Sequence, residues 1–223
     1  MAAKRWLDTG YLRAKPEAID SQAGVVTGIK VCSAGEAKGH GVHLEAEFIE
    51  TVAKQGNSTT RGLKARFGHP NMCSESLGTY IGRFRNFSTG KTVREDGTEA
   101  AFCFADLHLS ETAKDTPNGD LYAYVLGMAE KEADMFGTSI VFHQGPIYRR
   151  TKSGQKVYPY DVDGRRNEEF RQADGPDYIE CKKLCACDCV DDPAANDGLF
   201  SAFASETVAG QVTEFLDLHP QVF

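Results

Sequence analysis

The sequence predicts an α+β fold in which strands and helices do not alternate regularly. At least five segments show the β-branched content or the two-residue alternation of strands, and three show the 3.6-residue apolar spacing of helices. Regular strand–helix–strand units, which would indicate a parallel α/β sheet, are not recognisable. The chain has 223 residues, of which 41% are hydrophobic and 26% charged, so it has the composition of an ordinary globular protein with a full core.

The chain divides into three parts. Residues 1–24 begin with an aromatic and basic stretch and are interpreted as an N-terminal arm with one short strand. Residues 25–200 contain the other expected strands and form the predicted main domain. Residues 201–223 belong to an expected C-terminal helix, whose apolar periodicity starts at residue 199. We expect this helix to connect to a scaffold-like extension in a longer native chain.

The first quarter of the chain predicts a strand, a loop and a helix. Residues 25–31 are rich in β-branched side chains and form the strand, and the glycine-rich residues 33–41 form a flexible loop. Residues 44–54 have helical spacing, and Gly56–Asn57 ends that helix. Its apolar face carries Phe48, Ile49 and Val52.

Further strands are expected in the rest of the chain. Two alternating segments, 79–87 and 99–109, predict a hairpin, and residues 110–114 one helical turn. Residues 145–177 are charged and rich in glycine and proline, which predicts a long loop, and loops of this length are usually functional or mobile. Residues 178–190 are predicted to form another strand.

The segment from Asn118 to His143 predicts a helix followed directly by a strand. Asn118 can cap the helix, and Gly137 is expected to end it in the left-handed conformation. Residues 138–142 are β-branched or aromatic apart from Ser139 near the start, and they form the strand. Such a rigid serine can present a nucleophile, although most serines at such positions are caps or turn residues. The apolar stripe of the helix carries Leu121, Val125, Met128 and Met135.

Asp188 is the notable residue of the strand over 178–190. Strand alternation places it on a face with small apolar neighbours, and three cysteines on the other. A buried carboxylate needs a partner, and a histidine is the natural one, because the carboxylate then fixes the imidazole tautomer that accepts a proton from serine. The alternative is that Asp188 is solvated or caps a turn.

His69 has a backbone direction fixed by its neighbours. Gly68 allows the chain to turn before it, and Pro70 favours an extended conformation at His69. His69, Ser139 and Asp188 therefore have the types needed for nucleophilic catalysis: a hydroxyl, a base and a group that orients the base.

No cofactor or metal is required by the sequence patterns. The cysteines at positions 181, 185, 187 and 189 have strand rather than chelating spacing, and His40 with His43 lacks an acidic or cysteine companion at ligand spacing. The seven cysteines, without an export signal, are interpreted as reduced thiols.

Charge and hydropathy narrow the expected partners and location. A net charge of −7 and a pI near 5.4 argue against a general nucleic-acid binder, which needs a basic face. No apolar run approaches the length of a membrane span, and the N-terminus lacks the hydrophobic stretch of a signal peptide, so we expect a cytosolic protein without membrane contact.

Three blocks follow one another along the chain: FGHP with the downstream GTYIGRF, then MFGTSIVF, then a strand ending in VDDPAAN. Taken in this order, they resemble the prohead (capsid maturation) proteases of tailed bacteriophages, which are related to herpesvirus assemblins. The similarity covers roughly residues 24–200, which would then be a protease domain. It implies that His69 is the general base and Ser139 the nucleophile. Relatives often carry a glutamate where this chain has Ala186, so the hypothesis is that Asp188, two residues on and on the same face, orients the histidine.

The resemblance also implies a fold and a function. The fold is a small, mostly antiparallel, barrel-like sheet surrounded by helices, as in herpesvirus proteases. The function is a serine endopeptidase that cleaves scaffold and major capsid protein segments inside the assembling procapsid in the host cytoplasm, without a cofactor. Relatives in the assemblin group function as dimers, and an arginine-pair loop supplies a hydrogen-bond donor to their oxyanion, which makes Arg165–Arg166 or Arg149–Arg150 candidates for that role here. The alternative is a catalytically inactive assembly or scaffolding protein with the same fold.

Overall fold

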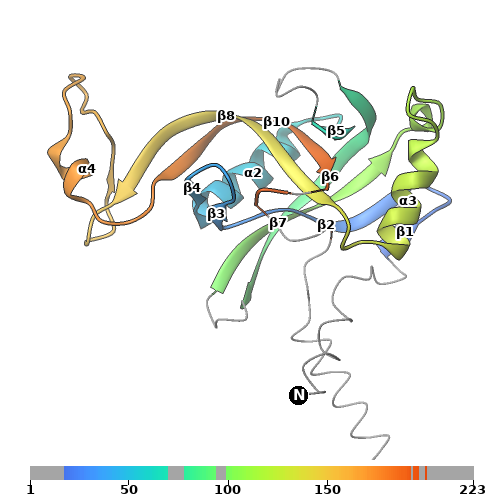
Figure 1. The fold of residues 1–223 in the computed structure, drawn as a ribbon, viewed down its shortest axis with the longest axis horizontal. Coiled ribbons are helices and arrows are strands. Elements are labelled where there is room, and N and C mark those ends of the chain that lie inside the picture. The colour runs from blue at the N-terminus through green and yellow to red at the C-terminus, as the bar shows by residue number, and fades with distance from the viewer. Residues whose placement is uncertain (1–17, 70–77, 94–98, 192, 196–198, 200–223) are drawn as a thin grey trace, which may run out of the picture.

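The structure is a computed structural model, which describes residues 18–69, 78–93, 99–191, 193–195 and 199. This part of the chain combines one open, mostly antiparallel sheet with few helices, which confirms the predicted α+β class (Figure 1). The strands are β1 (Ile19–Asp20), β2 (Val25–Ser33), β3 (Gly35–Ala37), β4 (Val42–Leu44), β5 (Leu63–Phe67), β6 (Thr79–Val93), β7 (Glu99–Leu109), β8 (Gly137–Arg150), β9 (Lys156–Val157) and β10 (Tyr178–Val190). The helices are α2 (Ala46–Ser58), the short 3-10 helix η2 (Glu111–Lys114), α3 (Leu121–Lys131) and α4 (Glu168–Gln172).

Strand β10 has neighbouring strands on both of its edges. The sheet follows the order β1-β2-β7-β6-β5-β10-β4-β3, and β8 pairs with β10 in addition. β10 runs parallel to β5 and β4 and antiparallel to β8. The pairing with β8 extends over the whole length of β10, from Tyr178 to Val190, with three register shifts. Near its C-terminal end β10 is also buried on both faces, because the consecutive residues Cys187, Asp188 and Cys189, which point to alternate faces, are all buried.

Most strands predicted from alternation are confirmed. β2 and β6 begin at the predicted residues and continue further, and β7 and β10 have the predicted bounds. β6 and β7 form the predicted hairpin, and η2 is the predicted helical turn, capped by Ser110. The short strand expected in the N-terminal arm is β1. The first 17 residues of that arm and the expected helix over 201–223 lie outside the described residues.

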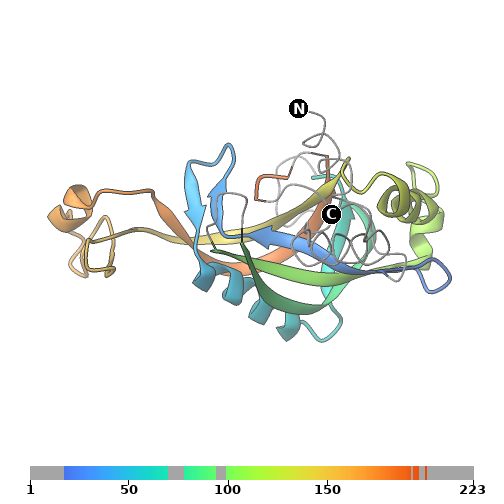
Figure 2. The same ribbon diagram turned by 90° about the horizontal axis from the view of Figure 1, so that it is seen from below.

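Helix α2 covers one face of the sheet, as Figure 2 shows. Its apolar residues Phe48, Ile49 and Val52 are buried, as predicted. The predicted end at Gly56–Asn57 is wrong, because the helix continues to Ser58. Gly56 lies against the ring of Phe87, where a Cβ would be 2.5 Å from the ring, and the Asn57 amide exchanges hydrogen bonds of 2.7 and 2.9 Å with the Phe87 backbone. Close packing on β6 therefore explains the glycine, which does not end the helix.

The boundary between α3 and β8 differs from the prediction. Asp120 caps the helix in place of Asn118, since its side chain accepts a hydrogen bond of 2.9 Å from the Ala123 N–H. The helix ends at Lys131 with Glu132 as its C-cap, and Gly137 is the first residue of β8. Met135 is 60% exposed because it lies beyond the helix, whereas Leu121 and Val125 are buried as predicted.

Two predicted loops contain regular structure. The glycine-rich residues 33–41 include β3, which forms a hairpin with β4. Residues 145–177 continue β8 to Arg150 and add β9 and α4. These residues, together with the start of β10, form an arm that projects from the sheet and carries α4 near its end (Figure 1). The strand continues because β8 stays paired with β10 as far as Tyr148 and Tyr178.

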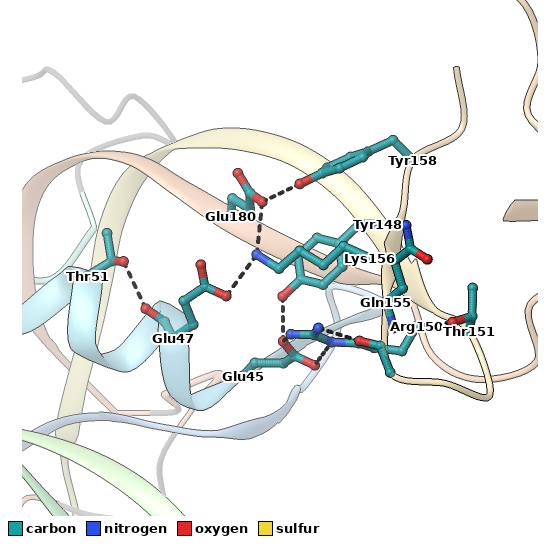
Figure 3. Close-up of polar contacts among 11 residues, drawn as sticks. Glu45, Glu47, Thr51, Tyr148, Arg150, Thr151, Gln155, Lys156, Tyr158 and Glu180 are labelled. Carbon is teal, nitrogen blue, oxygen red and sulfur yellow. Dashed lines mark hydrogen bonds and ion pairs between the residues drawn. The ribbon is translucent and has the colours of Figure 1, made fainter. Parts of the chain in front are cut away.

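A polar network fixes the base of this arm (Figure 3). Glu45, just before α2, accepts hydrogen bonds from the Tyr148 hydroxyl at 2.7 Å and from Nε and Nη2 of Arg150 at 2.9 and 2.6 Å. The Arg150 guanidinium lowers the pKa of the Glu45 carboxyl. Lys156 of β9 lies 3.2 Å from the Glu180 carboxylate of β10 and 4.4 Å from the Tyr148 ring. The network therefore joins β8, β9 and β10 to the start of α2.

Within the described residues, the structure contains no helix with the length and apolar content of a membrane span.

Two helical glycines are expected to respond oppositely to alanine. Gly56→Ala should destabilise the protein by about 1–3 kcal/mol, because a methyl group overpacks the contact with Phe87. Gly127→Ala in α3 is the matched control, since beyond the adjacent helix backbone no atom of the described residues lies within 4 Å of the added methyl group, and it should stabilise by about 1 kcal/mol through helix propensity. Urea unfolding measures both, and equal effects of the two substitutions would contradict the packing explanation.

Candidate active site

Three adjacent strands place one residue each in a single row. Asp188 of β10 is opposite Ser139 of β8 on one edge and opposite Arg66 of β5 on the other. Residues that are directly opposite on paired strands project from the same face, with Cβ atoms about 4.5–5.5 Å apart in antiparallel pairs. The sheet register therefore brings an arginine, a carboxylate and a hydroxyl together, although 73 and 49 residues separate them along the chain (66 to 139 and 139 to 188).

The Asp188 carboxylate is buried and contacts two side chains, the Arg66 guanidinium and the His69 imidazole. Nε of Arg66 donates to Oδ1 and Nη2 donates to Oδ2, each at 2.6 Å, and neither side chain is exposed. Nδ1 of His69 lies 2.6 Å from Oδ2. The interpretation of Asp188 as a solvated or capping residue is therefore wrong, and the prediction of a buried carboxylate with a histidine partner is confirmed.

His69 reaches Asp188 because the chain turns directly after β5. Gly68 has a φ of +72°, a conformation that glycine adopts easily, and its N–H donates to the Cys189 carbonyl of β10 at 2.8 Å. This confirms the predicted turn at Gly68, while Pro70 lies outside the described residues. Because a carboxylate only accepts hydrogen bonds, Nδ1 of His69 carries a proton in this contact, and when the ring is neutral Nε2 is the nitrogen with the free lone pair. The His69 side chain is 43% exposed, so the ring has access to solvent.

His69, Ser139 and Arg66 line one pocket with a cavity volume of about 330 Å³. Most of its other walls are apolar and include Val42, Leu44, Ile140, Phe142 and Ile179. Ser139 is the third residue of β8 and is half-buried. Among the described residues no hydrogen bond joins its hydroxyl to His69, and such contacts are often long before substrate binds. The pocket thus brings the predicted nucleophile and base to one cavity of a size that suits ligand binding.

The arginine pairs expected at the oxyanion lie elsewhere. Arg150 belongs to the network with Glu45, and Arg149 donates to Asp177 at 2.6 Å. Arg149 is ten residues from Ser139 along β8, which is roughly 33 Å of strand. Arg165 is 80% exposed beside Asp163. Arg166 is paired through its backbone with Tyr160 in an isolated antiparallel β-bridge, in the arm beyond β9. Within this chain neither pair lines the pocket, because β8 continues where a loop was expected.

The cysteines of β10 are mostly buried thiols. Cys187 and Cys189 are buried on the strand that carries Asp188, and burial raises the pKa of the Cys189 thiol to about 12. Burial raises the pKa of Cys181 to about 12 as well. Protonated thiols are poor nucleophiles and poor metal ligands. No group of three or more potential metal ligands occurs in the described part of the chain.

Comparison with family profiles, with curated proteins and with solved structures found no match to this chain.

Arg66 is the site residue that sequence reasoning missed. It lies in a short segment that looks apolar and basic, and a lysine or arginine there is usually solvated. The available signal was the expectation of a buried aspartate, since a buried carboxylate is stabilised by a cation as well as by a histidine. The alternation Leu63, Ala65, Phe67 on β5 gave no indication that the intervening Arg66 is also buried.

Removal of the Asp188 carboxylate should destabilise the fold. Asp188→Ala removes the carboxylate that pairs with the buried Arg66 guanidinium, and breaking a buried ion pair typically costs about 3–5 kcal/mol. Asp174→Ala is the control, because Asp174 is exposed and its removal should change stability by less than about 0.5 kcal/mol. Equal midpoints of urea unfolding for the two variants would show that the buried pair is not as the structure describes it.

Proposed function

We propose that the protein is a serine endopeptidase of the prohead protease type, which cleaves scaffold and major capsid protein segments during phage prohead maturation. The observation that carries this proposal is the 2.6 Å contact between Asp188 and Nδ1 of His69 in a pocket that Ser139 also lines. The motif resemblance around His69 and Ser139 supports the substrate assignment. A herpesvirus-protease-like form of the sheet, action in the procapsid within the host cytoplasm and a homodimeric state belong to the same proposal.

The chemistry follows from the roles of the three side chains. Ser139 Oγ attacks the peptide carbonyl carbon while Nε2 of His69 takes the hydroxyl proton. The tetrahedral intermediate then collapses, the C–N bond breaks, and His69 gives the proton to the leaving amine. Water hydrolyses the acyl-enzyme by the same proton transfers in a second cycle. Asp188 accepts the Nδ1–H throughout and stabilises the imidazolium that forms.

A second candidate is a catalytically inactive capsid assembly or scaffolding protein with the same fold. The observation in its favour is that Ser139 and His69 are not hydrogen-bonded to each other in the described structure. In such a protein the pocket would have no catalytic role, so replacing Ser139 should leave capsid assembly unchanged.

Replacing the proposed nucleophile tests the two candidates. Ser139→Ala should abolish cleavage of co-expressed capsid and scaffold proteins, a loss of at least about 10³-fold, while the fold survives. Ser153→Ala is the control, because Ser153 lies in an exposed turn and its hydroxyl is hydrogen-bonded to the Thr151 hydroxyl, away from the residues that line the pocket. Gel analysis of the capsid proteins and circular dichroism measure the two effects. Processing at the wild-type rate by Ser139→Ala would refute the peptidase.

A further inference from the structure

Arg66 is a buried arginine whose guanidinium matches both oxygens of one carboxylate. Nε donates to Oδ1 and Nη2 donates to Oδ2 of Asp188, each at 2.6 Å, and both side chains are fully buried. A planar fork of this kind determines the orientation of a carboxylate as well as its position. The Asp188 carboxylate therefore has one defined orientation.

One carboxylate oxygen is shared between Arg66 and His69. Oδ2 accepts the hydrogen bond from Nη2 of Arg66 and also lies 2.6 Å from Nδ1 of His69. The terminal torsion of an aspartate is intrinsically broad, so without the fork the carboxylate could rotate and Nδ1 would lose its fixed acceptor. The orientation of the half-exposed His69 ring thus depends on Arg66 through Asp188.

Stability alone explains this pair poorly. Burying two charges is costly, and replacing a buried ion pair by apolar residues of similar volume is often neutral or stabilising. The same strand already contributes apolar residues to the core, since Leu63 and Ala65 are both buried there. An arginine at this position is better explained if the orientation of Asp188 matters for His69.

We propose that Arg66 is a positioning residue of the peptidase site, which acts on His69 by holding the Asp188 carboxylate. The inference rests on the proposed function. Since Arg66 acts on the residue that transfers the proton, its loss should lower kcat and leave KM nearly unchanged.

The first test is a substitution series at Arg66. Arg66→Met should lower kcat by about 10–100-fold per folded molecule, the size of effect that a misplaced catalytic group produces. Arg66→Lys should recover part of the loss, because it keeps the charge but lacks the fork. Arg83→Met, on the neighbouring β6, is the control, since Arg83 contacts the Gly62 carbonyl and should leave kcat unchanged. Circular dichroism at the assay temperature gives the folded fraction.

A double-mutant cycle separates positioning from a merely structural role. If Arg66 acts through Asp188, Arg66→Met should change kcat by less than about twofold in a protein that already carries Asp188→Asn. An equally large loss in both backgrounds, or an unchanged kcat per folded molecule in Arg66→Met alone, would overturn the proposal.

A spectroscopic measurement distinguishes this inference from the proposed function. Nitrogen-15 spectra of histidine-labelled protein should show His69 protonated at Nδ1 in the wild type and a mixture of tautomers in Arg66→Met. A tautomer that responds to Arg66 in a chain without peptidase activity would end the proposed function and support the positioning role. If the tautomer of His69 is the same in the wild type and in Arg66→Met, the positioning role is overturned, whether or not the chain has peptidase activity.

Discussion

The buried carboxylate of Asp188 is the group on which the candidate site depends. It lies on a strand paired along both edges, and the register of those pairings sets Arg66 on one side and Ser139 on the other. The two hydrogen bonds from Arg66 offset the cost of burying the charge, and the remaining contact orients His69. A shift of one residue in either register would turn one partner to the opposite face, so the site is specified by the same pairing that specifies the sheet.

The candidate site and the projecting arm lie at opposite ends of β8. Near Gly137 the strand is part of the pocket, and near Arg150 it is part of the network of Glu45, Tyr148 and Lys156. Both ends are held by buried or half-buried charged groups, although only the first combines them with a hydroxyl and a partly exposed histidine. The side chains that the proposed chemistry needs therefore lie at the sheet, and residues 145–177 of the arm line no part of that pocket.

Local patterns in the sequence predicted the elements that carry strong periodicity. The apolar face of α2 and the bounds of β7 and β10 followed from residue spacing, and His69 with Asp188 was predicted as a pair because a buried aspartate needs a partner. Glycines misled the prediction in both directions. Gly56 was expected to end α2 but lies inside it, where its missing side chain leaves room for Phe87. Gly137 was expected to end α3 but is the first residue of β8. Such outcomes depend on tertiary contacts, as do the continuation of β8 past residue 145 and the burial of Arg66.

The central claim is that Ser139 and His69 act together in the pocket that Asp188 organises, and chemical labelling of the serine tests it most directly. After reaction with a fluorophosphonate, peptide mass spectrometry should find one adduct, on Ser139, and His69→Gln should abolish it because the hydroxyl is then no longer activated. An intact protein without an adduct, or with an adduct on Ser139 that forms equally fast in His69→Gln, would contradict the account.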